Sequence, residues 1–304
     1  MDKETLSNYG WIVICVLVLA VMIALATPFG GFIADAVKST TQGLFDVNQN
    51  ALNSTGLINI GDQSFGEGGN GGVGGSGDAG DQSGTGLPAV GTSAEDCTWD
   101  EIKAISEAGK GDEYFNLGDT KTFTTTDGKT IVMEIVAFNA DTKADGSGTA
   151  GITWISKDAV AKHGMNSEYT NANGWVASGM RTWLQGEFYN YLPQDVRENI
   201  VNVNKSYYDY TDQTTETCVD SIWIPSSLEV FGGTVAETFG AEYTNFFSNN
   251  DARIKYYDGV ATVWWLRSSP SAYQYHFRGV NDNGNSSGAN SAHSSLGVVI
   301  GFCT

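Results

Sequence analysis

The sequence predicts an α+β protein in which an N-terminal membrane helix and a glycine-rich linker precede one globular domain. Three observations support this prediction. Residues 11–33 form an apolar run without a charged side chain, and residues 61–91 consist largely of glycine and small polar residues. The remainder mixes short helical patterns with many short, aromatic-rich strands, which is the pattern of an α+β domain.

The composition indicates a folded core and argues against nucleic acid as a partner. About 41% of the 304 residues are hydrophobic, which is too apolar for a disordered chain. The 35 acidic residues outnumber the 16 basic ones, so that the formal charge is -19. Phosphate backbones are bound by clustered lysine and arginine, and the sequence contains no basic cluster. We expect the acidity to keep an exposed domain soluble.

Residues 11–33 predict a transmembrane helix, with residues 1–10 as its N-terminal flank. At about 1.5 Å per residue the run spans roughly 34 Å, which is enough for a hydrocarbon core of about 30 Å. Tyr9 and Trp11 stand where an interfacial aromatic belt is expected. The alternative is a signal peptide cleaved after the small-x-small triplet at residues 24–26. The first four residues are not positively charged, which favours a retained helix in a single-pass protein of the cell membrane.

Residues 34–60 predict an amphipathic extension of this helix, because apolar residues recur at spacings of three and four. A membrane run that continues into an amphipathic helix resembles the N-terminal helix of small pilins, as do Glu4 ahead of the run and Tyr9-Gly10 at its start. The resemblance implies self-assembly through the N-terminal helix into a surface filament. The sequence departs from the prepilin pattern, because no glycine-plus-aromatic cleavage site precedes the run.

Residues 61–93 predict a flexible linker, since such a stretch cannot bury enough apolar surface to offset its ordering entropy. A linker of this kind has a root-mean-square span of about 30 Å. The globular domain is expected over residues 94–304, outside the cell.

The domain contains recognisable local signals. Thr98 and Glu101 form a capping-box pattern at the start of a short helix that Gly109 ends. Asp127-Gly128 lies between two β-rich runs and predicts a hairpin. The remaining expectations are a helix over 180–191, a second helical pattern from residue 195, buried strands over 221–225 and 260–266, and a closing apolar strand over 296–302.

Four stretches resemble a domain family of unassigned function from secreted proteins of Gram-positive gut bacteria. They are Trp99-Asp100-Glu101-Ile102 with Gly118-Asp119-Thr120-Lys121; Gly174-Trp175 with Met180-Arg181 and Trp183-Leu184; Ser227-Leu228-Glu229-Val230-Phe231-Gly232; and Trp264-Trp265-Leu266-Arg267-Ser268. That family is similar to the C-type lectin fold, which formylglycine-generating enzymes and the variable proteins of diversity-generating retroelements use. The resemblance implies a C-type-lectin-like domain. In the variable proteins, a short C-terminal segment displays variable residues on a fixed scaffold.

Residues 271–295 fit that comparison and predict a binding face. The segment is dominated by Asn, Ser, Gly, Tyr and His, a mixture that binding loops favour because Tyr gives contact area at low entropic loss. Phe277 and Val280 are expected to anchor it in the core. An ordinary polar surface loop is the alternative. The expected ligand-binding residues are Tyr273, Gln274, Tyr275, His276, Asn281, Asp282, Asn283, Asn285, Ser286, Ser287, Asn290, Ser291 and His293.

Trp264, Trp265, Leu266 and Arg267 are assigned to the scaffold, because adjacent strand residues point to opposite faces. Stacking of a sugar on one of the tryptophans is the alternative. The expected ligand is a protein or a glycan on another cell, a virus or a host.

The sequence does not predict an enzyme, a cofactor or a metal site. The surroundings of Cys218 and Cys303 do not resemble the reactive cysteine pair of formylglycine-generating enzymes, and the three histidines are scattered. Asp141 and Asp145 lie in a loop that is a candidate for a weak calcium site, although the EF-hand spacing is absent. Because lectin-type folds bring their termini together, the resemblance also implies a disulfide between Cys97 and Cys303.

Overall fold

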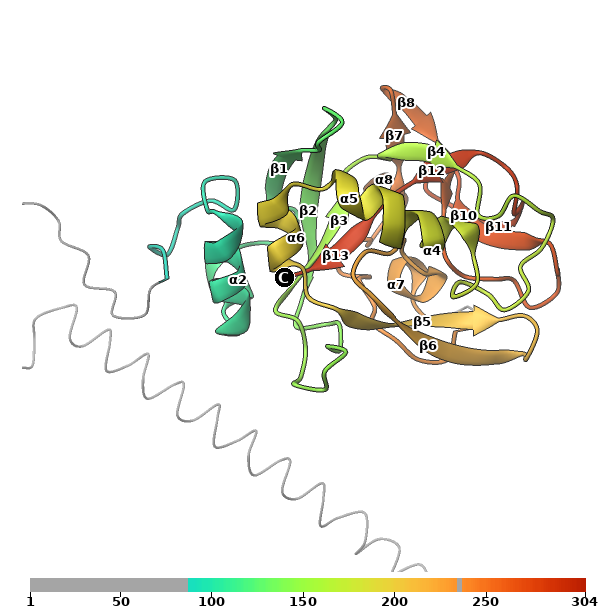
Figure 1. Ribbon diagram of the computed structural model, residues 1–304, viewed down its shortest axis with the longest axis horizontal. Helices are drawn as coiled ribbons and strands as arrows, with labels where there is room; N and C mark the ends of the chain where they lie inside the picture. The colour runs from blue at the N-terminus through green and yellow to red at the C-terminus, as the bar shows by residue number, and fades with distance from the viewer. Residues whose placement is uncertain (1–86, 234–236) are drawn as a thin grey trace, which may run out of the picture. The chain divides into compact units, whose positions relative to one another are not determined.

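The computed structural model describes residues 87–233 and 237–304 (Figure 1). The predicted membrane helix over 11–33, its extension over 34–60 and nearly all of the linker over 61–93 lie outside the described residues. Within the described ranges, no helix has both the length and the apolar character needed to cross a bilayer. The described part is a mixed α and β structure rich in sheet, as the sequence predicts at this level.

Two sheets form the frame. The first is antiparallel, in the order β1-β2-β3-β13. The second has the order β11-β10-β9-β12-β4, in which only the β12 and β9 pair is parallel. The strands are β1 Thr120–Thr124, β2 Thr130–Phe138, β3 Ile152–Ser156 and β13 Gly301–Cys303, and then β4 Ala161–His163, β9 Trp264–Trp265, β10 His276–Val280, β11 Ser286–Ser291 and β12 Leu296–Val298.

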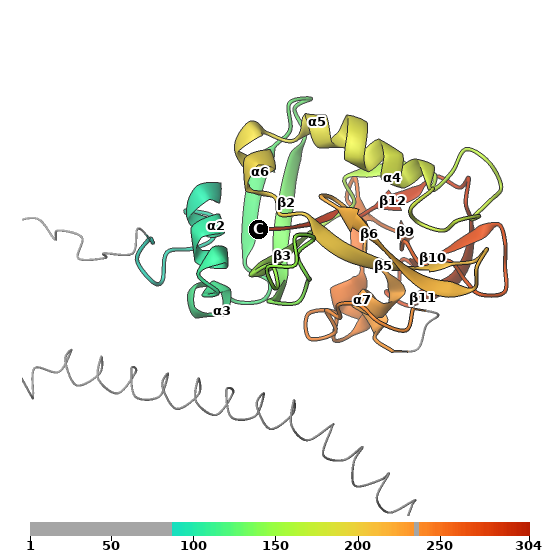
Figure 2. The same cartoon turned by 60° about the horizontal axis from the view of Figure 1, so that its bottom comes forward.

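Two separate hairpins and several short helices complete the structure. The hairpins are β5 Val203–Asp209 with β6 Thr214–Asp220, and β7 Lys255–Tyr257 with β8 Val260–Thr262. The helices are α2 Trp99–Glu107, α3 Gly111–Tyr114, α4 Gly179–Trp183, α5 Tyr189–Tyr191, α6 Gln194–Asn199, α7 Ser227–Phe231 and α8 Asn250–Arg253, with the π-helical turn η1 Leu184–Phe188 joining α4 to α5. Both views place α2 at one end of the domain and the β10–β11 hairpin at the other (Figures 1 and 2).

The local signals are confirmed where they depend on neighbouring residues. Thr98 and Glu101 form the predicted capping box of α2. The turn between β1 and β2 contains Gly128 with φ of 88°, a conformation that favours glycine. The predicted strand over 221–225 is wrong: this segment is buried but makes only an isolated bridge, between Trp223 and Gly301.

Each of the two long apolar runs, residues 260–266 and 296–302, forms two short strands instead of one, because the chain passes from one sheet to another within the run. Residues 260–266 form β8 and then β9, which belong to different sheets. Residues 296–302 form β12 in the five-stranded sheet and β13 in the four-stranded sheet, with the buried Val299 and Ile300 between them. The strands are therefore shorter than the apolar runs predict.

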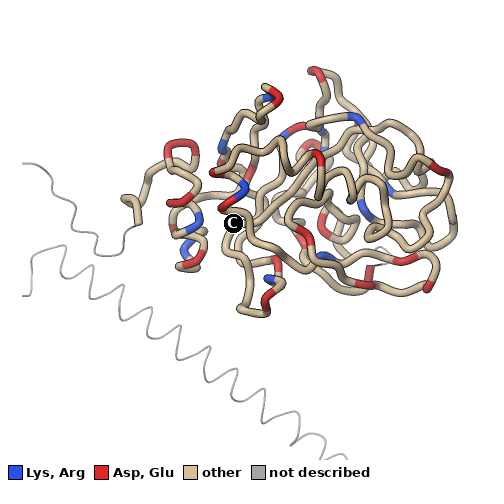
Figure 3. Tube along the Cα trace, in the orientation of Figure 1, with Lys and Arg blue, Asp and Glu red and all other residues tan. Residues whose placement is uncertain are grey.

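The beginning and the end of the described domain lie together. The Ser106 hydroxyl at the end of α2 donates a hydrogen bond to the Thr304 carbonyl. Ile152 and Thr304 exchange backbone hydrogen bonds of 3.4 and 3.1 Å. The frame around them is filled by large side chains, since five tryptophans (Trp154, Trp175, Trp223, Trp264 and Trp265) are each fully buried. Charged residues are spread over the domain without a basic patch (Figure 3).

Candidate functional site

The segment 271–295, here called the ribbon, forms the β10–β11 hairpin at one edge of the five-stranded sheet. Phe277 and Val280 are fully buried, which confirms their predicted role as core anchors. Gly279 pairs with Trp265 of β9, so the ribbon backbone is joined directly to the tryptophan strand. The ribbon is therefore an ordered part of the fold and not a free tail.

None of the thirteen predicted ligand-binding residues is buried. Their side chains stand on a backbone that the sheet holds in place, which is the arrangement a recognition surface needs. The exposed ones are Tyr273, Gln274, Tyr275, Asp282, Asn283, Asn285, Ser286 and His293, and the half-buried ones are His276, Asn281, Ser287, Asn290 and Ser291.

The start of the ribbon is held by Asn171, a fully buried residue that the sequence reasoning missed. Its Nδ2 donates to the carbonyl oxygens of Tyr273 and His276, at 2.9 Å each. Its backbone N–H donates to the Gln274 carbonyl at 3.2 Å. One buried side chain and its backbone thus fix the residues that carry the two exposed tyrosines.

A groove of about 420 Å³ lies beside this fixed loop. Three segments line it: residues 170–172, the tip of the β5–β6 hairpin through Tyr210, Thr211 and Gln213, and the ribbon residues Gln274 and Tyr275. Its walls consist of hydroxyls, amides and tyrosine rings, and no charged side chain lines it. Sequence reasoning found only the ribbon wall, because the other two segments lie about 60 and 100 residues away along the chain.

Aromatic side chains of the ribbon lie next to an aromatic side chain of the segment that precedes Asn171. The ring centroids of Tyr169 and His293 lie 3.9 Å apart, and those of Tyr273 and His276 lie 5.6 Å apart. Tyr169 is 60% exposed and was not among the predicted residues. The exposed tyrosines provide flat contact area next to the polar groove.

The predicted site divides into two parts, because the hairpin turn lies at the other end of the strands from the groove. Asn281 organises this turn, and its Oδ1 accepts hydrogen bonds from the backbone N–H groups of Asn283 and Asn285. Gly284 has φ of 74°, and a Cβ at that position would collide with the Asn250 carbonyl. The turn residues therefore lie apart from the groove and form a second, separate patch.

Trp264, Trp265, Leu266 and Arg267 are all fully buried. The two tryptophans point to opposite faces and belong to different core clusters. The Trp265 indole donates to the His163 carbonyl at 2.8 Å, and the Trp264 indole donates to the Arg253 carbonyl at 2.9 Å. Stacking of a sugar on either tryptophan is therefore wrong for this structure, since neither ring reaches the surface.

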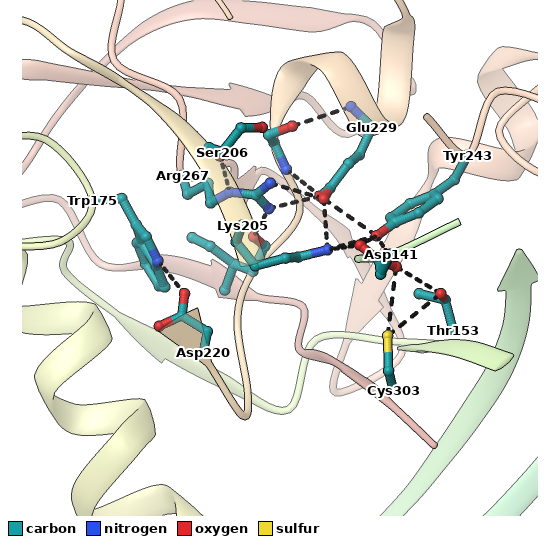
Figure 4. A network of polar contacts seen from close by, with 12 residues as sticks. Asp141, Thr153, Trp175, Lys205, Ser206, Asp220, Glu229, Tyr243, Arg267 and Cys303 are labelled. Atoms are coloured by element: carbon teal, nitrogen blue, oxygen red, sulfur yellow. Dashed lines mark hydrogen bonds and ion pairs between the residues drawn. The ribbon is translucent and has the colours of Figure 1, made fainter. Parts of the chain in front are cut away.

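Arg267 belongs to a buried charge cluster, which comprises Asp141, Lys205, Glu229, Tyr243 and Arg267 (Figure 4). Its guanidinium donates to both oxygens of Glu229, at 2.7 and 2.8 Å, and to the carbonyls of Ser206 and Ile224. Burial alone would raise the pKa of Glu229, but the charges of Arg267 and Lys205 lower it to about 2. Glu229 is therefore ionised at neutral pH.

Lys205 lies at the centre of the cluster. Its Nζ is 2.5 Å from Asp141 Oδ1 and 2.8 Å from Glu229 Oε1. Two cations and two carboxylates are present, so the formal charges cancel within the cluster. Buried charges are retained only when they are paired in this way, and the cluster joins five separate segments of the chain. Asp141 binds Lys205 here, which accounts for a residue that the sequence assigned to a candidate calcium loop.

The second half of the chain matches a known protein family. The model of a family described as a domain of unknown function (DUF6273) matches residues 150–303, just over half of the chain. The protein belongs to the DUF6273 family. The match covers β3 to β13 and therefore the whole ribbon and every groove residue. No curated protein and no solved structure matches the chain.

The expected disulfide between Cys97 and Cys303 is not formed. Cys97, Cys218 and Cys303 are all free thiols. Cys303 Sγ lies 3.5 Å from both Asp141 Oδ2 and Thr153 Oγ1, beside the charge cluster, whereas Cys97 lies just ahead of α2. The ends of the domain meet through the Ser106 to Thr304 hydrogen bond instead, so the proximity of the termini was predicted correctly but the cross-link was not.

Proposed function

We propose that this protein is a surface-displayed ligand-binding protein of the adhesin or receptor type, whose binding face is the ribbon with its neighbouring groove. One observation supports this most strongly: the polar and tyrosine side chains of the ribbon are exposed or half-buried, while Phe277 and Val280 anchor its backbone in the core. A fixed backbone lowers the entropy lost when a ligand binds. Tyrosine adds large contact area with few rotatable bonds.

The chemistry of the groove favours an uncharged polar surface on the ligand. Amide and hydroxyl groups line it, and Tyr210 and Tyr275 supply rings on which apolar ligand faces can rest. Both a glycan and a loop of a protein on another cell, a virus or a host meet this description. We further propose that the ribbon sequence varies between copies of the gene. In that case the differing codons are expected mainly at the exposed ribbon positions.

We propose a C-type-lectin-like scaffold for this binding face. The meeting of the two domain ends at Ser106 and Thr304 supports it. We propose no catalytic role for Cys218, since burial raises the pKa of its thiol to about 12 and keeps it protonated at neutral pH. This disfavours a relative of the formylglycine-generating enzymes that acts through a thiolate.

The charge-free run over 11–33 and the linker over 61–93 support an anchor in the cell membrane with the domain outside the cell. The second candidate is a pilin-like filament subunit, which the amphipathic pattern over 34–60 favours. The two differ on fractionation: a filament is sheared from the cell and sediments as a polymer, whereas a monomer stays with the membrane.

The binding proposal is tested by adhesion of cells that display the full chain. They are offered mucin-coated plates, epithelial monolayers and a panel of bacterial cells. Replacing Tyr273, Tyr275 and His293 together with alanine is expected to reduce adhesion at least about tenfold, because aromatic contact residues dominate binding energy.

Tyr256→Ala is the matched control, because Tyr256 is 45% exposed on β7, away from the ribbon, and Tyr275 is 46% exposed. This control should adhere like the unmodified protein. Undiminished adhesion of the triple variant would refute the binding face. Absence of adhesion by the unmodified protein to every surface offered would also count against the proposal.

A further inference from the structure

The Lys205 amine is enclosed between two carboxylates in the interior of the domain. Lys205 lies on β5, Asp141 follows β2, and Glu229 lies in α7 (Figure 4). The side chains of all three are about 1% exposed. The amine nitrogen is 2.5 Å from Asp141 Oδ1 and 2.8 Å from Glu229 Oε1. A nucleophile, an acyl carbon and a carboxylate that can accept a proton are thus held together in the interior of the domain.

Two aromatic rings lie against the Lys205 amine. Lys205 Nζ lies 3.8 Å from the centre of the Trp223 ring and 5.3 Å from that of Tyr243. Condensation requires that the ammonium first pass one proton to the Asp141 carboxylate, whose Oδ1 lies 2.5 Å away. This transfer leaves a neutral amine facing a neutral carboxylic acid, which are the two species that condense.

The Asp141 carboxyl group is also polarised. The Tyr243 hydroxyl lies 2.9 and 2.8 Å from its two oxygens, and the Thr153 hydroxyl donates to Oδ2 at 2.7 Å. Fixed donors of this kind stabilise the oxyanion that forms when a nucleophile adds to a carbonyl carbon. Enclosure of both reactants also replaces an encounter in solution with a preset geometry.

We propose that Lys205 and Asp141 join in an intramolecular amide bond that the folded protein forms by itself. The Lys205 nitrogen attacks Asp141 Cγ, so that a C–N bond forms. Glu229 Oε1 accepts the second proton from the nitrogen and delivers it to the departing Asp141 hydroxyl. The Cγ–O bond breaks and one water molecule leaves. No oxidation state changes and no further reactant is needed.

Arg267 is a positioning residue for this step. Its two hydrogen bonds to Glu229 keep that carboxylate deprotonated and directed at the amine. The resulting bond would join β5 covalently to the segment that connects β2 and β3, across a span of 64 residues. Such a cross-link would reinforce a contact that the backbone already makes here, through the Lys143–Val203 bridge and the hydrogen bond from the Asn204 N–H to the Thr142 carbonyl. It does not depend on the binding role of the ribbon.

The mass of the unmodified full chain tests the proposal. After denaturation, the protein is expected to be lighter than its sequence mass by one water molecule. Trypsin should fail to cleave after Lys205, and fragment spectra should contain one peptide pair joined through Lys205 and Asp141. A chain at full sequence mass, or a lost water that maps elsewhere, would overturn the proposal. Neither result requires a variant to fold.

Two variants test the role of Asp141 as the acyl group and the role of Lys205 as the nucleophile. Asp141→Asn retains an acyl carbon and loses ammonia instead of water, so its cross-linked form should have the same mass as the cross-linked unmodified protein. Lys205→Arg removes the nucleophile and should keep its full sequence mass. A joined peptide pair in Lys205→Arg would assign the linkage to another residue and contradict the proposal.

Discussion

Replacing Arg267 with methionine is expected to lower the free energy of unfolding by about 3–5 kcal/mol. Arg267 is fully buried and donates to both oxygens of Glu229 and to two backbone carbonyls. Methionine fills a similar space but leaves these acceptors without their donor and the Glu229 carboxylate without its main counter-charge. Removing one partner of a buried ion pair destabilises a protein more than replacing both partners with apolar residues, because the remaining charge is left buried and unpaired.

Urea unfolding of the full chain, followed by tryptophan fluorescence, measures this change. Lys129→Met is the comparison for an exposed pair, because the Lys129 side chain is 58% exposed and 3.5 Å from Asp127; it should cost no more than about 1 kcal/mol. The double variant Arg267→Met with Glu229→Leu should recover part of the loss, since it removes both charges. Equal losses for Arg267→Met and Lys129→Met would contradict a structural role for the charge cluster.

Phe277→Ala is expected to destabilise the domain by about 3–5 kcal/mol and to abolish adhesion without changing any exposed side chain. The Phe277 ring is fully buried and anchors β10 to the core. Its loss leaves a cavity beneath the ribbon, so the residues of the groove lose their fixed positions. Unfolding in urea and adhesion of displaying cells measure the two effects.

Tyr275→Ala, two residues away, is the matched control for stability. Tyr275 is 46% exposed, so its truncation should change the free energy of unfolding by no more than about 0.5 kcal/mol while it weakens adhesion. The two variants therefore separate anchoring from contact. Normal stability of Phe277→Ala would mean that the ribbon does not depend on the core.

The sequence predicted the parts of this fold that depend on local pattern. The capping box of α2 and the hairpin turn at Gly128 involve residues within a few positions of each other. The spacing of Phe277 and Val280 within a polar segment likewise indicated which residues of the ribbon enter the core. Such signals are present in the chain before any long-range contact forms.

The rest of the site depends on contacts between distant segments. The groove needs residues 170–172 and the tip of the β5–β6 hairpin as well as the ribbon, and nothing in the composition of either loop links it to residue 275. The charge cluster shows the same limit, because Asp141 and Lys205 look like ordinary polar positions until the fold buries both. Apolar runs also do not reveal where a chain changes sheets, as it does at Val299 and Ile300.

Hydrogen exchange across the ribbon in the native full chain tests most directly whether recognition rests on an anchored backbone. The amides of Arg278 and Ala292 donate to the carbonyls of Ser268 and Tyr275, at 2.8 and 2.9 Å. They should exchange as slowly as the core strand β3, while the exposed tip at Asp282 exchanges quickly. Fast exchange throughout residues 276–292 would show a ribbon that the frame does not hold, and would contradict the account.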